Sequence, residues 1–160
     1  MRALVRAKIG ALVAAVAATF VAAGSAARDP NLAAALATVH RQCPQAEAQI
    51  STGVWMAGWA FNALYGNCNA GDGHDQHVWF FGGGRLLGMD TREPDSSKAI
   101  VAMWRDDRTI AFLYVLYRRS DPLCCPTGGG TIVRFRIAGD HVAALDKLPP
   151  RELGSVAVGR

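Results

Sequence analysis

The sequence predicts an α+β domain: an N-terminal helix packed on an antiparallel sheet of about six to seven strands, which form a meander of hairpins stapled by disulfides. Three observations predict this class. Apolar residues repeat at helical spacing only near the start of the mature chain, later segments alternate with a period of two, and the chain contains four cysteines, an even number. A length of 160 residues, 51% of them hydrophobic and 19% charged, suits one domain, which we expect over residues 28–150.

Residues 1–27 have the layout of a secretory signal peptide. A basic segment, Met1–Lys8, precedes an apolar run of 15 residues, Ile9–Ala23, which is short for a helix that spans a bilayer. Small residues follow up to Ala27, where a signal peptidase could cleave. An uncleaved membrane anchor is the alternative. Cleavage would leave a periplasmic, cell-envelope or secreted protein with no stable membrane anchor.

The positive charge of the sequence lies mostly in this leader. The whole chain has 17 basic and 13 acidic side chains, a formal charge of +4, and Arg2, Arg6 and Lys8 stand in the leader with no acidic residue. Residues 28–160 therefore carry 14 basic and 13 acidic side chains, a net charge of +1. Because residues 28–160 have almost no net positive charge to neutralise phosphates, we do not expect a nucleic acid as a partner.

The helix is predicted over Pro30–Gln42. Asp29 can accept hydrogen bonds from the free N–H groups of the first turn, and Pro30 fits that turn because its missing donor costs nothing there. Apolar side chains then recur on one face, at Leu32, Leu36 and Val39. Pro44 ends the run, so the pattern indicates a short amphipathic helix.

The later segments alternate with a period of two and predict strands separated by turns rich in Gly, Asn and Asp. They are Val54–Tyr65, His77–Phe81, Arg85–Asp90, Ile100–Trp104, Thr109–Tyr117, Thr131–Ala138 and Val142–Asp146. Thr109–Tyr117 is apolar on both faces, which is typical of a central strand covered on two sides. In Val54–Tyr65 the alternation places Trp55 and Trp59 on one aromatic face, although a helix also fits because the intervening residues are rather apolar. Residues 151–160 predict a loose C-terminal tail.

The cysteines Cys43, Cys68, Cys124 and Cys125 favour two structural disulfides in an exported chain. A bridge between the adjacent Cys124 and Cys125 is strained, because neighbouring side chains in an extended backbone point to opposite faces. We therefore expect this corner to be bridged to Cys43 and to Cys68, in one order or the other. Each such bridge closes a loop of more than fifty residues and contributes about 4 kcal/mol in the chain-entropy model.

Three arginines form the first candidate site, for a small anionic ligand. Arg134 and Arg136 share one face of a predicted strand, and Arg118 lies near the end of the neighbouring strand. Guanidinium groups bind anions through forked, charge-assisted hydrogen bonds. The alternative is an ordinary solvated sheet face, on which Asp140 or Asp146 would be the partner of an arginine.

The other candidates are weaker. Asp72, His74 and His77 bring carboxylate and imidazole groups together at short spacing, which could hold a metal ion, but the spacing matches no recognised ligand motif. We therefore expect a solvated loop, with no metal and no cofactor. Trp55 and Trp59 suggest either buried core or a stacking platform for sugars. The sequence has no GxSxG elbow, no phosphate-binding glycine motif and no HExxH pattern, so we do not expect an enzyme.

Several motifs carry a resemblance to a known family. They are the run Tyr117–Gly129, then Val133–Arg136 and Leu145–Pro149, and upstream His77–Phe81 and Gly83–Thr91. Over roughly Trp55 to Pro150 the chain resembles the LppP/LprE family of actinobacterial, mycobacterial-type cell-envelope lipoproteins. The resemblance implies an exported protein and the single domain expected over residues 28–150, and it supplies no catalytic residues. A lipoprotein of this family would have an acylated cysteine after its signal, whereas the first cysteine here is Cys43, so a lipid anchor is not expected.

Together these observations predict an exported, disulfide-stabilised, non-catalytic envelope or periplasmic domain that acts by binding or as a structural component. Its expected partner is an envelope small molecule or another envelope protein. One alternative is a binder of small anionic or sugar-like envelope ligands that uses a sheet face. The other is a metal-dependent hydrolase centred on His74 and His77.

Overall fold

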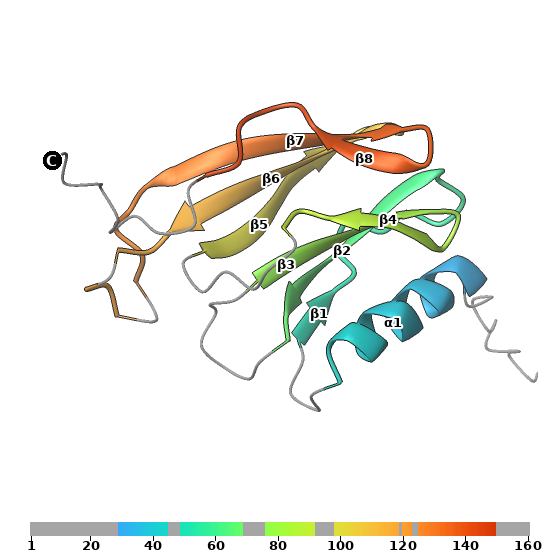
Figure 1. Cartoon of the computed structure of the whole chain (residues 1–160), viewed down its shortest axis with the longest axis horizontal. Helices are drawn as coiled ribbons and strands as arrows, with labels where there is room; N and C mark the ends of the chain where they lie inside the picture. The colour runs from blue at the N-terminus through green and yellow to red at the C-terminus, as the bar shows by residue number, and fades with distance from the viewer. Residues whose placement is uncertain are drawn as a thin grey trace, which may run out of the picture.

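The computed structural model describes residues 29–44, 49–68, 76–91, 98–118, 120–122 and 125–149. The predicted signal peptide and C-terminal tail lie outside these ranges. The described residues form one helix and two four-stranded antiparallel sheets, stacked as helix, first sheet and second sheet (Figure 1). The chain is therefore mostly sheet, and the predicted α+β class holds only in the broad sense.

The strands follow one another in sequence order within each sheet, β1-β2-β3-β4 and β5-β6-β7-β8. The elements are α1 (Pro30–Gln42), β1 (Gln49–Ser51), β2 (Phe61–Asn67), β3 (Gln76–Gly82), β4 (Arg85–Met89), β5 (Lys98–Arg105), β6 (Thr109–Leu116), β7 (Gly130–Ala138) and β8 (His141–Ala144). The bounds of α1 and the hairpins β3–β4, β5–β6 and β7–β8 confirm the sequence prediction to within a few residues. The short strand β1 was not predicted, since three residues are too few to show a period.

Helix α1 covers the face of the first sheet that points away from the second sheet. Asp29 caps the first turn, and its carboxylate also accepts a hydrogen bond of 2.7 Å from the indole Nε1 of Trp55. At the other end of the helix, the indole Nε1 of Trp79 donates to Gln42 Oε1 at 2.8 Å. Two tryptophans therefore tie the two ends of α1 to the body of the domain.

The expected single sheet of six to seven strands is wrong, and β3 shows why. Val78 and Phe80 on one face of β3 belong to the core between the two sheets, whereas Trp79 and Phe81 on the other face belong to the core beneath α1. A single sheet with a helix on one face would have left Val78 and Phe80 in water. Burying both faces requires a second layer, which β5 to β8 supply.

The expected strand over Val54–Tyr65 is also wrong in its first half, since β2 begins only at Phe61. Residues before it form turns, in which Gly58 adopts a left-handed conformation with φ of 79°. Trp55 consequently packs against Phe81 at the α1 side, while Trp59 lies exposed in the loop. The two tryptophans do not share a strand face.

Strand β6 is central in its sheet, as predicted, but described residues cover its outer face only in part, at Ala111, which is buried there. On its outer face Leu113 is half-buried and lies in register between Val101 of β5 and Ile132 of β7, both about half exposed. Met103 and Trp104 are likewise exposed. No described element covers the rest of this apolar face, so the expectation of two covered faces is corrected.

The predicted disulfide pairing is wrong: Cys43 is bonded to Cys68, with their Cα atoms 4.9 Å apart. Cys43 directly follows α1 and Cys68 directly follows β2, and the packing of α1 on the first sheet brings these two ends together. Cys125 follows β6 in the other sheet and is itself disulfide-bonded, while Cys124 lies outside the described residues. Closing a loop with a separation of 25 residues contributes about 3.5 kcal/mol in the chain-entropy model.

Candidate functional site

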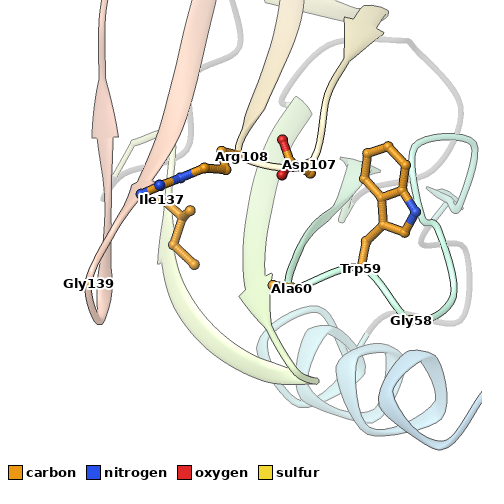
Figure 2. A pocket seen from close by; sticks show the side chains of 7 residues that line it. All are labelled: Gly58, Trp59, Ala60, Asp107, Arg108, Ile137 and Gly139. Atoms are coloured by element: carbon orange, nitrogen blue, oxygen red, sulfur yellow. The ribbon is translucent and has the colours of Figure 1, made fainter.

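A groove of about 590 Å³ opens at the end of the sandwich where β2 begins. Three connections form it: the loop before β2, the turn between β5 and β6, and the turn between β7 and β8. Its lining residues are Gly58, Trp59, Ala60, Asp107, Arg108, Ile137 and Gly139. Figure 2 shows Trp59 on the wall contributed by the first sheet, with Asp107 and Arg108 on the wall contributed by the second. The groove therefore lies where the two sheets meet.

The loop that carries Trp59 is held in place by the side chain of Asn62. Asn62 Oδ1 accepts from the backbone N–H of Met56 at 2.8 Å, and its Nδ2 donates to the carbonyl oxygens of Met56 and Trp59, each at 3.1 Å. The Asn62 carboxamide thus hydrogen-bonds backbone groups of both Met56 and Trp59 in this loop. Its burial, with 4% of the residue exposed, makes this loop a defined wall of the groove.

Arg105, the last residue of β5, links that wall to the second sheet. Its guanidinium donates to the carbonyl oxygen of Val54, to Asn62 Oδ1 at 2.8 Å and to the carbonyl oxygen of Phe61 at 2.6 Å. The same group lies over the Trp59 ring, 4.4 Å from its centroid, in a cation–π contact. Burial lowers the pKa of Arg105 from its ordinary value. The sequence predicts only a turn at Arg105, between the strands Ile100–Trp104 and Thr109–Tyr117, because no sequence pattern shows that a strand-end arginine reaches the other sheet.

The β5–β6 turn is shaped by Asp106. Its Oδ1 accepts from the backbone N–H groups of Arg108 at 2.8 Å and Thr109 at 2.6 Å, which is an Asx turn. These hydrogen bonds, the one from Arg108 first, lower the pKa of Asp106. The backbone N–H of Ile137 donates to the Arg108 carbonyl oxygen at 3.1 Å and ties the turn to β7. While these backbone groups are hydrogen-bonded within the protein, the side chains of Asp107 and Arg108 are exposed at the tip of the β5–β6 turn.

The groove combines an acceptor, a donor and a ring. The Asp107 carboxylate accepts hydrogen bonds, the Arg108 guanidinium donates them, and the Trp59 indole offers an apolar surface that is 36% exposed. The sequence contained one signal for this site, four consecutive charged residues at a predicted hairpin turn, Arg105 to Arg108. Exposed loops of this kind are where binding residues concentrate.

The predicted arginine site is only partly assembled, because Arg134 is already paired. Its Nε and Nη2 donate to the two oxygens of Asp146, each at 2.8 Å, and the Arg134 backbone N–H donates to Asp146 Oδ2 at 2.9 Å. This fork lowers the pKa of Asp146 to about 2 and raises the pKa of Arg134. The alternative of a solvated face with a carboxylate partner thus describes Arg134 correctly.

Arg118 and Arg136 lie at opposite ends of the β6–β7 pair. Arg136 is in register with Thr109 at the start of β6, whereas Arg118 follows the end of β6. At about 3.3 Å per residue the two are some 30 Å apart along the strand, too far for one small ligand. Both side chains are exposed, and anion binding by either of them stays a prediction.

The weak metal candidate is not brought together by the described residues. Asp72 and His74 lie outside the described ranges, and His77 is a buried residue of β3 whose ring packs edge to face on Trp79, with centroids 5.7 Å apart. Within residues that the structure describes, no group of three His, Cys, Asp or Glu side chains could hold a metal ion. In the same ranges no helix is both long and apolar enough to cross a membrane.

The fold and the groove define a small disulfide-linked β-sandwich, covered on one side by a helix and open at one end in a polar groove. The chain belongs to the LppP/LprE lipoprotein family, whose model matches residues 61–140. The match runs from the start of β2 to the β7–β8 turn and includes Asp107, Arg108 and Arg105, which confirms the resemblance seen in the sequence. This family has no known catalytic role, and its membership together with the disulfide fits an envelope or exported location. No curated protein and no solved structure matches the chain.

Proposed function

We propose that this protein is an exported, non-catalytic domain of the cell envelope that binds a small, neutral, hydroxyl-rich ligand, such as a sugar, in the groove at the start of β2. The leader, the even cysteine count and the family support the envelope role. In this proposal the leader is cleaved near Ala27 and the mature domain acts without a lipid anchor.

The observation that carries the binding proposal is that Trp59, Asp107 and Arg108 line one groove, with the Asp107 carboxylate between the Trp59 ring and the Arg108 side chain, which extends toward Ile137 (Figure 2). Sugars present an apolar ring face and a rim of hydroxyl groups that both donate and accept. An indole can stack on the first, and a carboxylate beside a guanidinium can bind the second. The volume of about 590 Å³ falls in the range of small-molecule sites.

Charge favours a neutral ligand over an anionic one. Asp107 stands directly beside Arg108 in the turn, so an anion that approached the guanidinium would meet a carboxylate as well. Arg105 cannot serve the anion either, because its Nη atoms already donate to protein acceptors. Of the two ligand classes that the sequence left open, the groove supports the sugar-like one.

The test is a binding experiment with the mature full-length chain and its disulfides intact. Neutral sugars (maltose, sucrose and cellobiose) and the anionic glucose 6-phosphate are titrated, with the Trp59 indole N–H signal followed by NMR. We expect saturable shifts with at least one neutral sugar, and Kd raised about fivefold or more by Asp107→Asn, which removes one charged acceptor. Met56→Ala, which trims an exposed side chain of the same loop outside the groove, is the matched control and should keep the wild-type Kd.

Two outcomes would contradict the proposal. One is that none of the three neutral sugars shifts the Trp59 signal. The other is that binding occurs but is equally strong in Asp107→Asn, so that the groove is not involved. Tighter binding of glucose 6-phosphate than of any neutral sugar would replace the neutral class by the anionic one.

A further inference from the structure

At the opposite end of β2 lies a second cavity, of about 350 Å³, which is open to solvent and formed by the first sheet together with Ile100 of β5. We infer that this cavity is a binding site for a small neutral ligand that carries an N–H or O–H donor next to an acceptor. Its lining comes from β1, β2, β3 and β5: Gln49, Ile50, Ser51, Tyr65, Gly66, Asn67, Gln76 and Ile100. None of these eight residues is charged, and none was singled out by the sequence.

The register of the first sheet sets three carboxamides in one row. Gln49 of β1 is opposite Asn67 of β2, and Asn67 is opposite Gln76 of β3. The neighbouring row on the same face holds two hydroxyl groups, since Ser51 is opposite Tyr65. Because side chains in register point to the same face of a sheet, all five polar groups lie on the face that looks toward the second sheet. Such a row of donors and acceptors is a polar surface where a sandwich interior is ordinarily apolar.

Asn67 contributes to this surface an acceptor that has no donor. The residue is 3% exposed, and its Oδ1 is buried without a hydrogen bond in the structure. A buried acceptor without a donor costs about 1 to 3 kcal/mol, so such atoms in native proteins call for an explanation. A ligand N–H or O–H in the cavity beside Asn67 would satisfy it.

The cavity exists because two contacts hold its walls. The Gln76 side-chain oxygen accepts from the backbone N–H of Ile100 at 2.6 Å and fixes β3 to β5. Gly66 allows β1 to approach β2: a Cβ atom at this position would lie 1.9 Å from the Gln49 carbonyl oxygen. A glycine is therefore required for Gln49 and Asn67 to stand side by side.

The chemistry of the lining selects the ligand class. Carboxamides and hydroxyls both donate and accept, so they pair with an amide or with adjacent hydroxyl groups, and without a charged side chain they give an ion no compensation for its lost hydration. Tyr65 adds an aromatic wall that packs edge to face on Phe112, with centroids 5.6 Å apart. An amide and a polyol share the required donor and acceptor, so the probes must tell them apart.

The experiment follows the side-chain amide signals of asparagine and glutamine in the ¹⁵N-labelled full chain. The probes are N-acetylglycinamide, which offers an amide, glucose, which offers hydroxyls, and N-acetylglucosamine, which offers both. We expect at least one probe to give saturable shifts of the Asn67 and Gln76 side-chain amides. Asn67→Leu, which removes the unpaired acceptor at similar volume, should raise Kd at least tenfold.

A second, more conservative variant tests the cavity even if Asn67→Leu does not fold. Tyr65→Phe keeps the ring contact with Phe112 and removes only the hydroxyl, and we expect Kd to rise about fivefold with an unchanged melting temperature. Met56→Ala, at the other end of β2, is the control and should bind as the wild type does. Absence of saturable shifts with all three probes would mean that the cavity holds water only, and the inference would fail. Equal Kd values for the wild type and both cavity variants would also overturn it.

The readout separates this cavity from the groove, because the groove is followed by the Trp59 indole and the cavity by the Asn67 carboxamide. Failure at one site therefore leaves the other site's result intact.

Discussion

Arg105 makes two kinds of contact with one planar group. Its guanidinium donates to two acceptors at the start of β2 and one in the loop before it, and its face packs against the Trp59 ring. A lysine offers a compact ammonium and cannot span separated acceptors in this way. Arg105 therefore both joins the two sheets and supports one wall of the groove.

We expect Arg105→Lys to lower the free energy of unfolding by about 2 kcal/mol, because carbonyl oxygens that now accept from the guanidinium lose their donor. The measurement is urea denaturation followed by circular dichroism. Arg108→Lys is the control: it changes an exposed side chain of the same turn and should cost about 0.5 kcal/mol or less. A loss for Arg105→Lys no larger than the control's would show that the contacts of Arg105 do not hold the sheets together.

At the scale of elements, alternate residues of β7 point to the core between the sheets and to the exposed outer face of the second sheet. Val133 is fully buried between the sheets, whereas Ile132, one residue earlier, is 48% exposed on the outer face of the second sheet. The alternation of this segment predicts that Val133, Phe135 and Ile137 point inward. The structure confirms this, because Val133 and Phe135 are buried between the sheets and Ile137 is partly buried against the same core. The exposure of Ile132 cannot be predicted from the sequence, because Ile132 is as apolar as the buried Val133.

This difference predicts a contrast between two neighbouring truncations. Val133→Ala should lower the free energy of unfolding by about 2 kcal/mol through a lost buried contact and a small cavity, while Ile132→Ala should change it by about 0.5 kcal/mol or less. Thermal and chemical denaturation of both variants at low protein concentration provides the comparison. Similar losses at both positions would mean that the outer face of the second sheet is covered in solution.

At the scale of the whole molecule, a buried hydrogen bond between Tyr114 and Asp90 joins the second sheet to the end of the first. The Tyr114 hydroxyl of β6 donates to Asp90 Oδ2 at 2.9 Å, and Asp90 Oδ1 accepts from the backbone N–H of Val78 at 3.0 Å. Burial first, and then the neighbouring Asp90 carboxylate, raise the pKa of Tyr114 well above its ordinary value of 10.0. The folded protein therefore keeps the Tyr114 proton where an unfolded chain would release it.

This shift predicts an alkaline loss of stability. Below pH 10 the tyrosine is protonated in both states and the free energy of unfolding is unaffected by it; above that value only the unfolded chain loses the proton, and unfolding becomes more favourable. The added slope approaches about 1.4 kcal/mol per pH unit for one proton. Tyr114→Phe should lack this part of the slope, which denaturation at a series of pH values between about 9 and about 11 would measure. Equal slopes for the two proteins would contradict the raised pKa.

The two proposed sites, at opposite ends of β2, differ in how far sequence reasoning could reach them. The charged hairpin turn of the groove is visible in the sequence, and Trp59 is one of two tryptophans that suggest either core or a sugar platform. That Trp59 and this turn line one groove depends on Arg105 and Asn62, which join the two sheets. The carboxamide row depends on strand register, and its first member lies in a strand too short to show a pattern. The sequence likewise left Asp140 and Asp146 as equal candidates for the partner of Arg134, and the structure shows that it is Asp146.

The sequence by itself determined the bounds of α1, the three hairpins and the family, because capping residues, period-two alternation, turn residues and short motifs act over neighbouring positions. Only the tertiary structure decided that the strands divide into two sheets, that Cys43 is bonded to Cys68, and which polar side chains meet at the two ends of the sandwich. These depend on contacts between residues far apart in the chain. Such contacts are set by the burial of both faces of the first sheet, between α1 on one side and the second sheet on the other.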